Sequence, residues 1–123
     1  MLESQKKGIT NLERLQGLGY EYRLENYVSG LSELTFRAYK VGPQEHFYRI
    51  TFQTTLYIQT ATRWDQGDFQ LATPEQYVEL ADAMGLSAIQ REQLLLFVVS
   101  PANKPKVLIL CHQVFVSQEI PLP

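Results

Sequence analysis

The sequence predicts an α+β fold: one antiparallel, meander-type sheet of about five or six strands, with two or three helices packed on one face. Helix-like and strand-like segments are grouped along the chain instead of alternating, and turn residues separate the strand-like segments at short intervals. The 123 residues, of which 45% are hydrophobic, suit one domain with a core of its own. We therefore expect a single domain over residues 1–123, with frayed ends at 1–8 and 121–123.

The first element is a predicted helix over residues 9–17. Thr10 and Glu13 have the spacing of a capping box, in which two side chains satisfy free N–H groups of the first turn. Gly17 favours an end of the helix, because glycine adopts the backbone conformation that follows a last helical turn. The apolar stripe that would face the core consists of Ile9, Leu12 and Leu15.

Three strands are predicted next, over residues 20–28, 33–41 and 46–60, with turns at 29–30 and 42–43. Side chains alternate between the two faces of a strand, so residues of one parity share a face. The expected core face consists of Tyr20, Tyr22, Leu24, Leu34, Phe36, Ala38, Tyr48, Ile50, Phe52, Leu56 and Ile58.

The strongest local signal follows a short predicted strand at 69–72. Thr73 is a typical N-cap, and Gln76 completes a capping box for a helix that ends before Gly85. A second short helix begins at Ser87 by the same pattern.

Two further strands are predicted over residues 94–99 and 106–117, joined by the turn-forming segment 100–105. The first of them is apolar at every position. That pattern is typical of a central strand covered on both faces.

Composition excludes several classes of protein. The net charge of −2 argues against a general nucleic-acid binder, which normally carries a basic excess. The N-terminal residues lack the apolar stretch of a secretory signal, and no apolar run is long enough to span a bilayer. We therefore expect a cytoplasmic protein without membrane association.

Catalytic chemistry has little support in the sequence. Cys111 and His112 are adjacent on a predicted strand, so their side chains point to opposite faces and cannot form a nucleophile–base pair. His46 is the other histidine, and no partner is evident for it. Asp65 and Asp68 lie in a loop but lack the further oxygen ligands of a calcium site. We predict no catalytic residue, no metal site and no cofactor.

Arginine and tyrosine side chains gather on the polar face of the predicted meander. These residue types bind anions, stack on bases and anchor protein interfaces. Two alternatives require no binding role: a solvated face whose charges pair across strands, or tyrosines covered by the first helix. The whole face comprises Glu21, Arg23, Glu25, Tyr27, Thr35, Arg37, Tyr39, Arg49, Thr51, Gln53, Tyr57 and Gln59. The predicted contact residues are Arg23, Arg37, Tyr39, Arg49, Tyr57 and the loop residue Trp64.

The leading hypothesis is a non-enzymatic protein-interaction or regulatory module, whose partner is another protein or a second copy of the chain in a homodimer. One alternative is a protein that binds a small anionic molecule, with or without catalysis. Another is a single-stranded nucleic-acid binder, against which the net charge counts. A concave cavity at the arginines would favour the small-molecule alternative over a flat interface.

Overall fold

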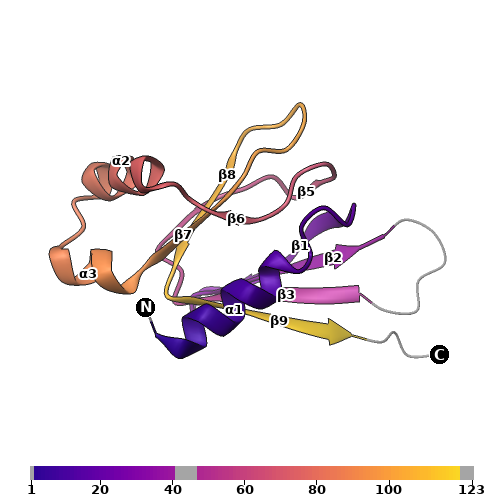
Figure 1. Cartoon of the computed structure of the whole chain (residues 1–123), viewed down its shortest axis with the longest axis horizontal. Helices are drawn as coiled ribbons and strands as arrows, with labels where there is room; N and C mark the ends of the chain where they lie inside the picture. Colours follow the sequence, from indigo (N-terminus) through magenta and orange to yellow (C-terminus); the bar gives the residue numbers. More distant parts are fainter. Residues whose placement is uncertain (1, 41–46, 120–123) are drawn as a thin grey trace.

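The computed structural model describes residues 2–40 and 47–119, and it confirms the α+β class (Figure 1). The elements in chain order are α1 (Glu3–Glu13), β1 (Glu21–Val28), β2 (Glu33–Tyr39), β3 (Phe47–Gln53), β4 (Tyr57–Gln59), β5 (Arg63–Trp64), β6 (Gln70–Leu71), α2 (Pro74–Met84), α3 (Ala88–Gln93), β7 (Leu95–Val99), β8 (Val107–Cys111) and β9 (Gln113–Glu119). The strands form two antiparallel sheets. Sheet A has five strands in the order β5-β1-β2-β3-β9, and sheet B has four in the order β4-β8-β7-β6.

One bent pair of chain segments joins the two sheets. The predicted strands 46–60 and 106–117 are each divided by a bend: β3 pairs with β9 in sheet A, and their continuations β4 and β8 pair in sheet B. Thr54 takes a left-handed conformation at the bend, with φ of 52°. Backbone bonds cross the corner from the His112 N–H to the Gln53 carbonyl (3.0 Å) and from the Leu56 N–H to the Leu110 carbonyl (2.8 Å). Backbone hydrogen bonds are thus present on both sides of the bend, which folds sheet B back over sheet A.

The main core lies between the facing surfaces of the two sheets. Rings from both sheets meet there, as in the pair Phe52 and Phe97, whose centroids are 5.3 Å apart. The predicted parity is confirmed along β1, β2 and β3: the residues on this face are buried, or partly buried against the core. Leu56 is the exception, 42% exposed, because the bend at Thr54 interrupts the alternation.

Helices α2 and α3 cover the other face of sheet B and bury a second, smaller apolar cluster there. All five residues of β7 are buried, which confirms the prediction of a central strand covered on both faces. Two of the three predicted capping boxes are present, with Thr73 accepting from the Gln76 N–H and Ser87 from the Gln90 N–H. The box predicted at Thr10 and Glu13 is wrong, because both residues lie within α1 and its N-cap is Leu2.

Helix α1 begins at Glu3, six residues before the predicted start, so the prediction that residues 1–8 are frayed is wrong for the described residues 3–8. Gln5 is buried and ties the helix to the corner: its Nε2 donates to the carbonyls of Gln93 (2.9 Å) and His112 (2.6 Å). The early start was missed because the buried positions of the first turns carry Gln5 and Gly8, which do not extend the apolar stripe. The predicted turn at 42–43, His46 and the predicted frayed end at 121–123 lie outside the described residues.

Gly8 permits the close packing of α1 on β9. A Cβ at this position would overlap the Val114 carbonyl oxygen, which is backbone and cannot move aside alone. We expect Gly8→Ala to lower the free energy of unfolding by about 1–3 kcal/mol, the usual cost of overpacking. Urea denaturation measures the loss, and Gly30→Ala is the matched control because nothing lies near its Cβ position. Equal effects of the two substitutions would contradict the packing of α1 described above.

Candidate functional site

Four arginines stand in one line across the outer face of sheet A. The strand registers place Arg63 opposite Arg23, Arg23 opposite Arg37, and Arg37 opposite Arg49. We call this line the arginine row. Neighbouring strands lie about 4.8 Å apart, so the row spans about 14 Å. Residue parity along the predicted strands identifies three of the four but not Arg63, because the two residues of β5 carry no strand signal.

A bulge in β1 supplies the main counter-charge. The register shifts between Leu24 and Asn26, and the carboxylate of Glu25 reaches over the row. Arg49 holds it through two nitrogens, with Nη2 at 2.9 Å and Nε at 3.1 Å, and Arg37 lies 3.6 Å away. The hydrogen bonds from Arg49, aided by the charges of Arg49 and Arg37, lower the pKa of Glu25 despite its partial burial.

The same bulge overturns one part of the predicted polar face. Beyond it, Tyr27 stands opposite Leu34, a buried residue of the core face, instead of sharing a side with the arginines. Tyr27 therefore does not belong to the arginine-bearing face.

Among the described residues, ion pairs with the row are found at one end only. Glu25 and Glu119 both pair with Arg49, and Glu25 also with Arg37. In the described chain, Arg23 and Arg63 have no carboxylate within ion-pair distance. Arg23 instead donates to the Tyr39 hydroxyl at 3.2 Å. The end of the row on β1 and β5 thus presents guanidinium groups without a carboxylate partner.

Two guanidinium groups of the row lie over aromatic rings. Arg37 lies 4.0 Å from the centroid of Phe47, and Arg23 lies 5.4 Å from that of Tyr39, both in cation–π geometry. Phe115 is 47% exposed on the same face, opposite Thr51. The face thus combines cations with partly exposed rings, the residue types that anchor protein interfaces.

Two of the six predicted contact residues lie elsewhere. Trp64 is 3% exposed; it stacks on Tyr22 at 5.5 Å and donates from Nε1 to the Gly67 carbonyl at 2.9 Å. Because Arg63 points outward from β5, the next residue points into the core. Tyr57 lies on β4 in sheet B and packs against the cluster under α2. The structure therefore brings together Arg23, Arg37, Tyr39 and Arg49, and not Trp64 or Tyr57.

Of the residues considered for catalysis, Cys111, His112, Asp65 and Asp68 lie in the described part of the chain. Cys111 is fully buried, and this burial raises the pKa of its thiol. His112 follows it at the corner, and His46 lies outside the described residues. Asp68 holds other parts of the fold together, accepting from the Gly17 N–H at 2.9 Å and from the Tyr22 hydroxyl at 2.7 Å. Within residues 2–40 and 47–119, no three His, Cys, Asp or Glu side chains gather closely enough to hold a metal ion.

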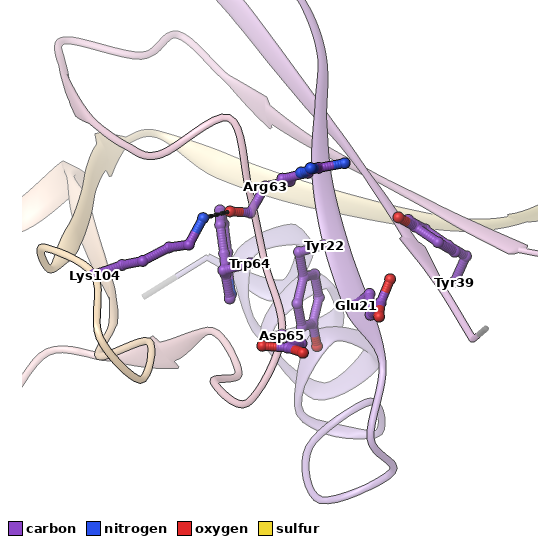
Figure 2. A pocket seen from close by; sticks show the side chains of 7 residues that line it. All are labelled: Glu21, Tyr22, Tyr39, Arg63, Trp64, Asp65 and Lys104. Carbon is purple, nitrogen blue, oxygen red and sulfur yellow. Dashed lines mark hydrogen bonds between the residues drawn. The ribbon is translucent and has the colours of Figure 1, made fainter.

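A hollow of about 250 Å³ adjoins the β5 end of the row (Figure 2). Its lining consists of Glu21, Tyr22, Tyr39, Arg63, Trp64, Asp65 and Lys104. Arg23, Arg37 and Arg49 do not line it, so three members of the row lie outside the hollow.

Comparisons with protein-family models, with curated proteins and with solved structures find no match to this chain. None of the helices in the described part of the chain combines the length and the apolar character needed to cross a membrane.

The ion pairs of Glu25 predict a pH-dependent stability. Because its pKa in the folded protein is depressed, the carboxylate stabilises the fold above its ordinary pKa of 4.5, and this contribution is lost as pH falls through the folded-state value. We expect Glu25→Gln to be less stable than wild type at neutral pH and the difference to vanish under acid conditions. Urea denaturation across a pH series checks this. Glu13→Gln, an exposed residue of α1 with no ion pair among the described residues, should stay parallel to wild type throughout.

Proposed function

We propose that the protein is a non-enzymatic interaction module, and that the outer face of sheet A binds an acidic polypeptide segment of a partner protein. The single observation that carries the proposal is the arginine row, with its directly opposed like charges.

Such an arrangement works against folding. Like charges directly opposite each other on neighbouring strands are destabilising, and the row contains three such contacts in succession. Glu25 and Glu119 offset the repulsion around Arg49, but the pair of Arg23 and Arg63 stays uncompensated within the described chain. Carboxylates from a partner would remove this repulsion. Features that lower stability without a structural return are typical of functional sites.

Arginine also suits this partner geometrically. A guanidinium binds a carboxylate through two parallel hydrogen bonds, as Arg49 does with Glu25. A row of about 14 Å is longer than one small anion and accommodates several carboxylates of an extended or helical segment. Tyr39, Phe47 and Phe115 provide ring surface for the apolar residues between them.

Two other partners are less favoured. Glu21, Glu25 and Glu119 lie among the arginines, and they would repel the continuous phosphates of a nucleic acid more than the spaced carboxylates of a polypeptide. A symmetric dimer through this face would oppose one arginine row to another across the two-fold axis. The net charge of −2 also disfavours a nucleic-acid partner.

Loss of the uncompensated charges should separate binding from stability. We expect the double variant Arg23→Gln/Arg63→Gln to bind a fluorescent Glu/Ser-repeat peptide about tenfold more weakly than wild type, a change of about 1.4 kcal/mol. Its free energy of unfolding should equal or exceed that of wild type, because like-charge contacts are removed. Fluorescence anisotropy and urea denaturation give the two quantities.

The controls separate this site from general charge effects. Arg14→Gln removes the exposed arginine at the C-cap of α1 and should leave binding unchanged. A Gln/Ser-repeat peptide should not bind, and wild-type binding should weaken as salt is raised. Equal or tighter binding of an oligo-dT of similar length would overturn the proposal in favour of single-stranded nucleic acid. Loss of stability in the double variant would show that the row serves folding instead.

Glu25 occupies the position that a partner's carboxylate would take, so it competes with the partner for Arg49 and Arg37. We expect Glu25→Gln to tighten binding of the Glu/Ser-repeat peptide several-fold, since the neutral amide leaves both guanidinium charges available. The same anisotropy titration measures the effect. Weaker binding by this variant would show that the bulge carboxylate orients the arginines for the partner and does not compete with it.

A further inference from the structure

The hollow at the end of the arginine row is lined by charges of both signs that do not pair with one another. Figure 2 shows the nitrogens of Arg63 and Lys104 above the carboxylates of Glu21 and Asp65 in this view. Within the described residues, no ion pair joins any two of these four side chains. Lys104 is already engaged, since its Nζ donates to the Arg63 backbone carbonyl at 2.8 Å. The groups left for a ligand are therefore one guanidinium and two carboxylates.

The Tyr22 and Trp64 rings beside the hollow are almost fully buried, and their polar atoms are already bonded. The Tyr22 hydroxyl donates to Asp68 at 2.7 Å, and burial together with this bond raises its pKa. The Trp64 N–H is likewise bonded, to the Gly67 carbonyl. Tyr39 differs: its hydroxyl oxygen accepts from Arg23, so its hydrogen remains available to a ligand beside Arg63.

A ligand with a single charge fits this lining poorly. An anion would meet Glu21 and Asp65, and a cation would meet Arg63 and Lys104. A ligand that carries both charges on neighbouring atoms satisfies both sets at once. The volume of about 250 Å³ lies below the range of drug-sized ligand sites and suits a metabolite of amino-acid size.

We propose that this hollow binds a free, zwitterionic α-amino acid. The α-carboxylate lies against the Arg63 guanidinium and the Tyr39 hydroxyl, the α-ammonium lies between Glu21 and Asp65, and the side chain projects out of the hollow. The site shares Arg63 and Tyr39 with the acidic-segment face, but it does not require that proposal to hold.

Removal of one charge from the ligand at a time tests the proposal. The probes are L-phenylalanine, 3-phenylpropanoate, which lacks the ammonium, and phenethylamine, which lacks the carboxylate. We expect isothermal titration calorimetry and amide chemical-shift titration to show phenylalanine binding, with each analogue at least about tenfold weaker. An analogue that binds as well as phenylalanine would overturn the proposal in favour of a single-charge site. Absence of binding by all three would overturn it as well.

Single substitutions test which residue binds the carboxylate of the ligand and which binds its ammonium group. Arg63→Gln should weaken phenylalanine and 3-phenylpropanoate but not phenethylamine, whereas Glu21→Gln should weaken phenylalanine and phenethylamine but not 3-phenylpropanoate. Both positions are partly or fully exposed, so neither variant is expected to unfold. Arg14→Gln is the neutral control. Uniform weakening of all three probes by either variant would contradict the assignment of the poles.

The amino-acid site and the acidic-segment face can each be refuted without the other. Glu21→Gln should retain binding of the Glu/Ser-repeat peptide, because it removes a negative charge and leaves the arginine row complete. A protein that binds the peptide but not phenylalanine would refute the hollow alone, and the converse would refute the acidic-segment face alone.

Discussion

The hydrogen-bonded corner between the two sheets is the constraint on which the rest of the fold depends. Because β3–β9 and β4–β8 are two halves of one bent pair, the buried faces of both sheets are brought together without a long connection. The bend relies on Thr54 in a left-handed conformation, which is unfavourable for a branched side chain. The surrounding structure compensates: Thr55 is buried, its N–H donates to the Ser32 carbonyl and its hydroxyl to the Phe52 carbonyl.

The corner also determines which surfaces remain free. Sheet B is covered on both faces, by sheet A and by α2 with α3, whereas α1 and the core cover only the inner face of sheet A. The outer face of sheet A is thus the broad surface on which polar residues can gather without cost to the core. The bulge at Glu25 then changes the register of that surface and brings a carboxylate over two of its arginines.

The sequence predicts well what depends on local patterns. Alternation identifies the core face around Phe36 and Phe52, and the capping box at Thr73 identifies α2, because each signal comes from residues close together in the chain. The sequence does not predict the features that depend on contacts between distant segments of the chain. No glycine or proline marks the bend at Thr54, and nothing local shows that Gln5 finds its partners on two remote segments.

For the candidate site too, the sequence predicts what depends on local patterns and not what depends on the pairing of distant strands. Arg23, Arg37 and Arg49 could be placed on one face by parity, but their alignment in a single row required the registers. Arg63 joined them only because a two-residue strand pairs with β1, and the same pairing turned Trp64 into the core. Short strands of this kind carry too few residues to show a period of two.

The bond between Lys104 and Arg63 has a consequence for the edge of sheet A. Because the Thr62 carbonyl points toward β1, where it accepts from the Leu24 N–H, the next carbonyl along β5 points away from the sheet. An outward carbonyl on an edge strand is a place where a foreign strand can begin to pair. The Lys104 ammonium group donates to this carbonyl at 2.8 Å, and its charge disfavours pairing with the backbone of another strand there. The loop between β7 and β8 therefore guards the β5 edge against strand addition, and it leaves the face of the sheet as the surface for recognition.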